Sequence, residues 1–206
     1  MKRQLLILLA LFTACLMSCQ DEQEYVESQT LCFATAYTDH DGHIEVLKDD
    51  MGNEYMVNDS RWILEPDRTC RVVCVYTLSD NNVATIYGVA QPFTSEAVDE
   101  SQVPSDSRVT DPIGVTSAYI GGGYLNMVLG IRVKNEESKH ELLPVRMESD
   151  SLVITLYHNA GGGTGVYTKT AYLCIPLSGY GLDKNDTVFL KYHGYEEDCN
   201  MSLIYR

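Results

Sequence analysis

A run of three glycines followed by an alternating apolar segment most constrains how this chain can fold. The glycines at 121–123 carry no Cβ atom, so the backbone there can take conformations and close approaches that strain other residues. Beyond them, Leu125, Met127 and Leu129 alternate with their neighbours. A two-residue period is typical of a β-strand, entered here through a bulge or a sharp bend. The chain is therefore expected to build a β-sheet around this stretch, which carries no catalytic motif.

Short alternating segments fill both halves of the sequence. In the first half, five or six of them are separated by turn sequences such as Asp41-Gly42. Short, closely spaced strands without a helical period are typical of a small barrel. In the second half, six or seven further segments predict a β-sandwich. The predicted fold class is therefore all-β, with a barrel domain over 28–95 and a sandwich domain over 112–206.

A polar segment separates the two predicted domains. Residues 96–111 include Pro104 and several serines, and apolar alternation stops there. Such a composition is typical of a connection between domains. Residues 96–111 are therefore expected to be a linker.

The N-terminus has the pattern of a lipoprotein signal peptide over residues 1–18. Lys2 and Arg3 precede an apolar run that is too short to span a membrane as a helix. The run ends in the sequence LMSC, which resembles a bacterial lipobox and predicts acylation, including palmitate, at Cys19. Cys15 is a weaker candidate because it would leave too short an apolar run, and an ordinary cleaved signal peptide is the other alternative. Each buried CH₂ contributes about 0.8 kcal/mol, so two or three acyl chains would hold the protein on a membrane.

Residues 19–27 form an acidic tether behind the lipidated cysteine. The tether resembles the acidic signal that sends Bacteroidetes lipoproteins to the outer face of the outer membrane. A solvated linker without a sorting role explains the same residues. The expected location is the outer membrane, and the choice between its two faces stays open.

The net charge of the chain argues against some classes of binding partner. The formal net charge is −14, and removal of residues 1–18 leaves 13 basic and 29 acidic residues, a charge of −16. Phosphate backbones and anionic lipid headgroups repel such a chain, which argues against nucleic acid as a partner. Contact with the membrane is therefore expected through the acyl chains alone.

Five cysteines follow Cys19, so an odd thiol remains whatever the pairing. Cys70 and Cys74 fall on one face of the same predicted strand, with Cα atoms about 13 Å apart at the usual rise of a strand. A disulfide needs Cα atoms within about 7 Å, so these two cannot bridge each other. Cys74 is expected to be a buried, inert thiol. The sequence contains no Cys-x-x-Cys pair and predicts no zinc or redox site.

The sequence offers no recognisable catalytic or metal-binding motif. The histidines and carboxylates of 39–43 lie at a hairpin tip, where Asp and Gly are already required by the turn. His158 continues the apolar face of a strand and is expected to be a hydrogen-bonded core residue. No nucleophile elbow and no zincin helix is present. We therefore expect no enzymatic activity, no cofactor and no metal.

Several of these features together resemble one family. They are the lipobox, the Asp41-Gly42 hairpin, the segments 62–66 and 71–77, the string IGGGYLN at 120–126 and the string LYHNA at 156–160. Over nearly its whole mature length the chain is similar to the NigD-like lipoproteins of Bacteroidetes. The resemblance implies an OB-like barrel followed by a C-terminal β-sandwich, in agreement with the strand count. The family takes its name from a gene in a bacteriocin operon, and it supplies no binding or catalytic residue to transfer.

Two triplets, at 150–152 and 186–188, resemble the O-glycosylation signal of exported Bacteroidetes proteins and make Ser151 and Thr187 candidate acceptors. Such triplets also arise by chance at the start of strands. Mass spectrometry of the native protein that found both residues unmodified would end this hypothesis.

The leading functional hypothesis is a non-catalytic, cell-surface or outer-membrane lipoprotein that binds a protein partner, with bacteriocin immunity as its role. The alternative is a glycan-binding accessory lipoprotein, because OB barrels and sandwiches both host oligosaccharide sites and the chain has 14 tyrosines. A third hypothesis is a hydrolase with two carboxylates, whose separation in space does not follow from sequence.

Overall fold

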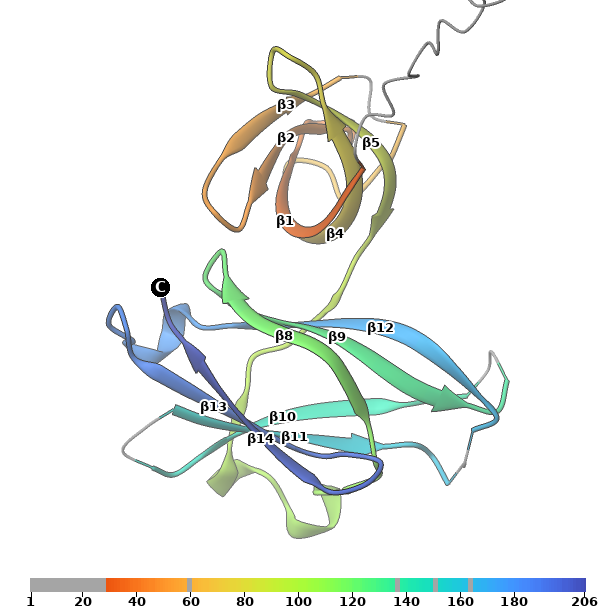
Figure 1. Ribbon diagram of the computed structural model, residues 1–206, viewed down its shortest axis with the longest axis vertical. Coiled ribbons are helices and arrows are strands. Elements are labelled where there is room, and N and C mark those ends of the chain that lie inside the picture. Colours follow the sequence, from red (N-terminus) through yellow and green to blue (C-terminus); the bar gives the residue numbers. More distant parts are fainter. Residues whose placement is uncertain (1–28, 59–60, 136–137, 150–151, 163–164) are drawn as a thin grey trace, which may run out of the picture.

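A computed structural model shows two β-domains stacked along the long axis of the molecule (Figure 1). It describes residues 29–58, 61–135, 138–149, 152–162 and 165–206. The predicted signal peptide, Cys19 and the whole segment assigned to the tether lie outside these residues, as does Ser151. Within the described residues, no helix has the length and apolarity needed to cross a membrane. The all-β prediction, a barrel followed by a sandwich, is confirmed.

The N-terminal domain is a closed five-stranded barrel with the strand order β1-β2-β3-β5-β4. Its strands are β1 (Thr30–Thr38), β2 (Ile44–Asp49), β3 (Glu54–Val57), β4 (Thr69–Leu78) and β5 (Val83–Ala90). Three fully buried alanines, Ala34, Ala36 and Ala84, keep the interior narrow. Between them pack Ile44, Leu47 and other apolar side chains, so the barrel is filled rather than open.

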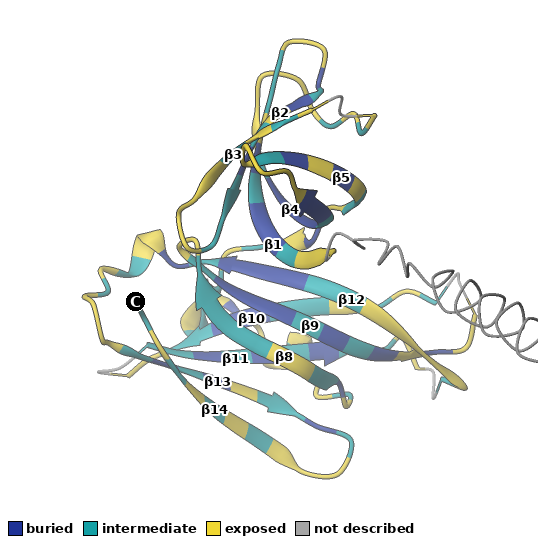
Figure 2. Ribbon diagram, turned by 45° about the horizontal axis from the view of Figure 1, so that its top comes forward, coloured by how far each residue is buried: buried dark blue, intermediate teal, exposed yellow. Residues whose placement is uncertain are grey.

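The C-terminal domain is a sandwich of two sheets. One sheet has the order β14-β13-β11-β10-β7 and the other the order β6-β12-β9-β8. The strands are β6 (Phe93–Thr94), β7 (Val98–Asp99), β8 (Gly114–Gly121), β9 (Tyr124–Val133), β10 (Glu141–Met147), β11 (Leu152–Asn159), β12 (Tyr167–Pro176), β13 (Thr187–His193) and β14 (Asp198–Ile204). Buried residues concentrate along β9 and β11 between the sheets, and along β4 in the barrel (Figure 2). Leu125, Met127 and Leu129 share the core-facing side of β9 with no exposed surface, as their alternation predicted.

The glycine run forms a hairpin turn rather than a bulge or bend at the start of a single strand. Gly122 and Gly123 connect β8 to β9, and both have positive φ, +60° and +83°. Two-residue hairpin loops favour this left-handed backbone because its twist matches that of the flanking strands. The irregularity in the β8–β9 ladder lies further away, between Val115 and Ser117.

The segment predicted as a linker lies along the sandwich and contributes to it. Val98 and Asp99 form β7, which pairs in parallel with β10, and Thr110 forms a bridge with His158. Two short 3-10 helices, Glu100–Gln102 and Ser105–Ser107, lie between them. Pairing of this segment satisfies backbone groups that a free linker would leave to water. The connection between the domains is therefore confined to the few residues between β5 and β6.

Candidate functional site

A polar cluster joins the two domains, and we call it the domain junction. It consists of Asp50 and Arg71 from the barrel and of Tyr119 and Asn126 from the sandwich. Asp50 follows β2, and Arg71 lies in β4. Tyr119 and Asn126 lie on either side of the β8–β9 turn, which points toward the barrel in Figure 1. The most distinctive sequence string of the chain thus lies at the contact between domains.

Arg71 carries the central charge of the domain junction. Its side chain is 3 % exposed, and that of its partner Asp50 is 13 % exposed. The Nη2 atom donates to Asp50 Oδ1 at 2.5 Å and to Asn126 Oδ1 at 2.9 Å. The Nη1 atom donates to Thr35 Oγ1 at 3.3 Å. A guanidinium buried this deeply is tolerated only because a carboxylate and two further acceptors replace its water.

The carboxylate of Asp50 is shared between the two domains. While Oδ1 accepts from Arg71, Oδ2 accepts from the Tyr119 hydroxyl at 2.8 Å and from Asn126 Nδ2 at 3.1 Å. Burial raises the pKa of the Tyr119 hydroxyl, and its hydrogen bond to Asp50 raises that pKa further, so the phenol stays a neutral donor. With both oxygens already engaged, Asp50 has the character of a structural anion rather than of a general base.

Aromatic and apolar side chains surround this charged pair. The Arg71 guanidinium carbon lies 4.7 Å from the centre of the Tyr124 ring, within the range of a cation–π contact. Phe33 and Val73 are directly opposed on the outer side of the barrel, yet each is only 4 % exposed. The sandwich covers them with Tyr119, Tyr172 and other side chains. The domain junction is therefore largely buried, and side chains of both domains contribute to it.

Cys174 closes the sandwich side of the domain junction. It has no exposed surface, and its thiol donates to Asn126 Oδ1 at 3.2 Å. Burial raises the pKa of the Cys174 thiol to about 11. A thiol that stays protonated at neutral pH is a poor nucleophile, so Cys174 serves packing and hydrogen bonding.

The hairpin glycines allow the close approach of the two domains. A Cβ atom built on Gly121 would lie 2.8 Å from Asp50 Cβ, and one built on Gly122 would lie 2.5 Å from Asp50 Oδ1. Real Cβ atoms do not approach other atoms this closely, so a side chain at either position would push Asp50 away. The glycine run therefore serves two needs, a left-handed turn and space for the carboxylate.

Two stacked histidines lie beneath the segment that follows β7. His158 is 2 % exposed, and its Nδ1 lies 3.2 Å from the carbonyl oxygens of Asp111 and Pro112. Since carbonyls only accept, this nitrogen must carry the proton. His158 Nε2 is then an acceptor for Nδ1 of His140, at 2.9 Å. The expectation that His158 is a hydrogen-bonded core residue is confirmed.

This arrangement leaves His140 sensitive to pH. Its Nε2 carries no proton in the neutral tautomer, and it is buried without a hydrogen-bond partner among the described residues. Burial and the neighbouring His158 lower the pKa of His140 below its ordinary value of 6.5. The unfolded chain thus binds a proton at a higher pH than the folded protein does, and protonation favours unfolding.

Because the pKa of His140 is lowered in the folded protein, we expect the stability linked to His140 to be fully present above pH 6.5 and to be lost as the pH falls below it. Urea unfolding at pH 8 and at pH 5.5 measures the difference in the free energy of unfolding. The His140→Asn variant should lose less stability between these two pH values than the unmodified protein. Equal losses in both proteins would show that His140 is not the responsible group.

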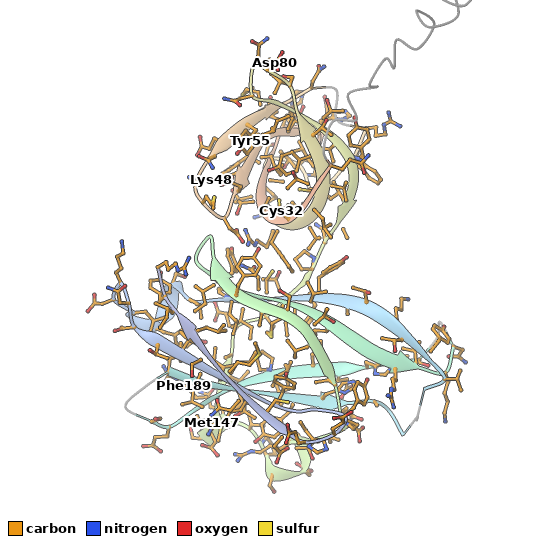
Figure 3. The ribbon with its side chains drawn as sticks, in the orientation of Figure 1. Cys32, Lys48, Tyr55, Asp80, Met147 and Phe189 are labelled. Carbon is orange, nitrogen blue, oxygen red and sulfur yellow. The ribbon has the colours of Figure 1, made fainter. Side chains whose placement is uncertain are left out.

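A cavity of about 710 Å³ opens at the end of the sandwich where β10 ends and β13 begins. This volume is in the range of small-molecule and side-chain pockets. Figure 3 labels Met147 and Phe189, which lie on these two strands at this end. We call this cavity the end cavity. The apolar part of its lining consists of Met147, Leu152, Tyr180, Leu182 and Phe189. The polar part includes Arg146, Glu148, Asn185, Asp186 and Thr187.

The charges of this end cavity do not cancel. Arg146 is neutralised by Asp99, with 2.6 Å between Nε and Oδ1, and its guanidinium lies over the Tyr180 ring. Glu148 and Asp186 are exposed and have no cationic partner within the part of the chain that the structure describes. The end cavity therefore presents two carboxylates without a cationic partner beside an apolar wall, and Asp186 Oδ2 also accepts from the Asp183 amide at 2.8 Å.

Of the predicted site residues, only Thr187 falls within the described part of the chain. It is the first residue of β13, is half-buried and lines the end cavity. Glycosylation at Ser151 and Thr187 and acylation at Cys19 stay predictions. In the hairpin at 39–43, Asp39 Oδ1 accepts from the amides of Asp41 and His43, which is a turn contact. The described residues contain no group of three or more His, Cys, Asp or Glu side chains arranged to hold a metal ion.

Comparison with solved structures finds the same two-domain fold in several Bacteroidetes proteins. A NigD-like immunity protein from Bacteroides caccae is 28% identical, with a TM-score of 0.72, over 86% of this chain and 93% of that one. A protein of unknown function, DUF1344, from Bacteroides vulgatus is 13% identical, with a TM-score of 0.67 over 87% of this chain and 92% of that one. A Bacteroides fragilis protein described as a "Putative lipoprotein" is 13% identical, with a TM-score of 0.63 over 87% and 99%. The last two show likeness of fold alone.

Comparison with curated protein sequences gives no match. Residues 95–205 match the family described as "NigD-like C-terminal beta sandwich domain". This match begins at residue 95, directly after β6, rather than at residue 112, in agreement with the observation that 96–111 belongs to the sandwich. It covers more than half of the chain, and the protein therefore belongs to the NigD-like family.

Proposed function

We propose that this protein is a non-catalytic interaction protein, held at the outer membrane by a lipid on Cys19, that protects its own cell from a bacteriocin. The observation that carries the proposal is the similarity across both domains to the NigD-like immunity protein of Bacteroides caccae. Immunity by binding requires a stable surface that recognises one partner, and it requires no chemistry.

The domain junction supports a binding role. Arg71, Asp50, Tyr119 and Asn126 use their charges and hydrogen bonds on one another, and the two domains present one preorganised surface. A rigid surface loses little conformational entropy when a partner binds, so more of the contact energy appears as affinity.

The charge of the protein supports a basic partner. The chain has a formal charge of −14, and the end cavity carries the exposed carboxylates of Glu148 and Asp186, which have no cationic partner among the described residues. A lysine or arginine side chain of a partner would lay its apolar stem along Phe189 and Leu182 and bring its charge to these carboxylates. The end cavity is therefore the region that we assign to partner contact.

Neutralising the two carboxylates should weaken binding of the partner. We expect Glu148→Gln with Asp186→Asn to reduce capture of the cross-linked partner from intact cells at least fivefold, because two charge-assisted contacts are lost. The matched control is Glu196→Gln with Glu197→Gln, which removes the same charge from the β13–β14 turn. Equal loss in both variants would show that net charge, and not the end cavity, attracts the partner.

The role in immunity is tested genetically in the producing strain. Deletion of the gene should make the strain sensitive to bacteriocin from its undeleted parent, and the full-length gene should restore resistance. Cys19→Ala should fail to restore resistance and should leave the outer-membrane fraction. A deletion strain as resistant as its parent would contradict the immunity role, and Cys19→Ala protein that stays with outer membranes would contradict the lipid anchor.

The glycan alternative has less structural support. Exposed tyrosines in a row would provide a stacking surface for sugar rings, but Tyr37, Tyr87 and Tyr167 lie on β1, β5 and β12. No two of these three strands are adjacent in a sheet. Cross-linking that recovers no protein partner above background would favour a glycan and call for a glycan array.

A further inference from the structure

Two cysteines of the barrel are directly opposed on neighbouring strands. Cys32 in β1 and Cys74 in β4 are partners in the antiparallel register of these strands. Cys74 is 1 % exposed in the barrel core, and the half-buried Cys32 packs against the same core. Both side chains therefore contribute to the core of the barrel, where Figure 3 labels Cys32.

This placement satisfies the geometric requirement for a disulfide bond. Directly opposed residues of antiparallel strands have Cα atoms about 4.5–5.5 Å apart, whichever kind of pair they form. Disulfide bonds join Cα atoms about 4.4–6.8 Å apart. The strand register alone thus brings Cys32 and Cys74 within bonding range without movement of the backbone.

The other cysteines of the described chain have different neighbours. Cys70 is opposite Ala36, and Cys174 is opposite Asn126 at the domain junction. Cys199 is opposite Tyr192 in the sandwich. Among the five cysteines of residues 29–206 that the structure describes, Cys32 and Cys74 are therefore the one directly opposed pair.

We propose that Cys32 and Cys74 form a disulfide bond with each other. The bond forms outside the cytoplasm by thiol–disulfide exchange with a disulfide-type oxidant. One cysteine thiolate attacks the oxidant disulfide, forms a mixed disulfide and releases the first oxidant thiol. The second cysteine then attacks the sulfur of the first, closes the Cys32–Cys74 bond and releases the second oxidant thiol. The two protons lost by the cysteines end on the two released thiols, so the exchange is balanced.

The surroundings of the pair assign the order of attack. Cys32 is half-buried near the exposed beginning of β1, whereas Cys74 lies in the core, and a hydrogen bond with Cys74 lowers the pKa of the Cys32 thiol. The same hydrogen bond, together with burial, raises the pKa of Cys74. Cys32 is therefore the first nucleophile, because the thiolate is the reactive form and the oxidant must reach it.

The bond would strengthen the barrel at the strand nearest the proposed anchor. Cys32 is the third residue of β1, the first strand after the predicted tether. A link to β4 would hold the start of β1 in place and would close a loop that contains β2 and β3. Closing such a loop restricts the unfolded chain and stabilises the folded barrel.

Peptide mapping of the lipoprotein extracted from its native outer membrane tests the proposal. Free thiols are blocked in detergent, disulfides are then reduced, and the released thiols receive a second label. We expect the second label on Cys32 and Cys74, a direct Cys32–Cys74 linked peptide before reduction, and the first label on Cys70 and Cys174. The same link should form in the reduced protein when oxidised glutathione is added.

Variants separate this bond from other effects of oxidation. Oxidised glutathione should raise the melting temperature of the unmodified protein and of Cys70→Ser by several degrees, and should leave Cys32→Ser unchanged. Cys32→Ser replaces a half-buried side chain, which lessens the risk of misfolding that Cys74→Ser carries. The first label on both Cys32 and Cys74, before and after glutathione treatment, would overturn the proposal. A bond from Cys32 to any other cysteine would do the same.

Discussion

Replacement of Asp50 with alanine is expected to lower the free energy of unfolding by about 3–5 kcal/mol, one of the largest effects of any single change in this protein. The substitution leaves the guanidinium of Arg71 buried, at 3 % exposure, without its counter-charge. It also removes the acceptor of the Tyr119 hydroxyl and one acceptor of the Asn126 amide. Urea unfolding followed by far-ultraviolet circular dichroism measures the loss.

The same substitution should also uncouple the two domains. Asp50 is the barrel group to which both Tyr119 and Asn126 of the sandwich bind. Without it, we expect calorimetry to show two thermal transitions, one for each domain, where the unmodified protein shows one. A single transition shifted to lower temperature would mean that the apolar contacts of Phe33 and Val73 hold the domains together without the ion pair.

An exposed ion pair of the same barrel provides the control. Lys48 Nζ lies 2.9 Å from Glu54 Oε1, and both side chains are well exposed. Water already solvates these charges, so Glu54→Gln should cost less than about 1 kcal/mol. A loss at Glu54 as large as that at Asp50 would contradict the argument from burial.

Gly122→Ala is expected to cost about 3 kcal/mol, by strain in the backbone and by collision at the domain junction. The φ angle of +60° at Gly122 is one that residues with a Cβ adopt at a cost of about 1–2 kcal/mol. The added methyl would also lie 2.5 Å from Asp50 Oδ1 and 3.0 Å from Arg71 Nη1, and forced overpacking costs a further 1–3 kcal/mol or so. Chemical unfolding of the variant measures the sum.

The neighbouring glycine separates these two costs. Gly123 also has a positive φ, +83°, but a Cβ atom there would meet nothing within 4 Å. Gly123→Ala should therefore show the backbone cost alone, about 1–2 kcal/mol. Equal losses for the two variants would show that Asp50 yields to the methyl group and that the close approach is not essential.

Local patterns of the sequence were sufficient to predict the fold class and many of the residues in the core. The alternation of Leu125, Met127 and Leu129 gave the correct buried face, and Cys74 is buried as its strand neighbours indicated. Both predictions were correct for the same reason: successive side chains of a strand point to opposite faces, and one of these faces is buried. The outline of the two domains followed from strand spacing and from the resemblance to a family.

The domain junction was not predicted from sequence. Arg71 is the one charged residue of the largely apolar segment 70–78, and this was the one local sign of a buried charge. Its partners Asp50 and Asn126 are 21 and 55 residues away, on other elements. Residues 96–111 lack apolar alternation, yet their backbone pairs with β10 and β11. A backbone pairing of this kind leaves no pattern in the side chains.

The sequence by itself determined that this protein is a chain of short strands, acidic overall, with a glycine turn at a fixed place among its apolar residues. These properties depend on neighbours along the chain, where strand period and turn chemistry act. The tertiary structure alone decided that the glycine turn meets Asp50, that Cys32 opposes Cys74 and that the carboxylates of Glu148 and Asp186 share a cavity. Each of these depends on strand register and domain packing, which bring together residues that no local interaction connects.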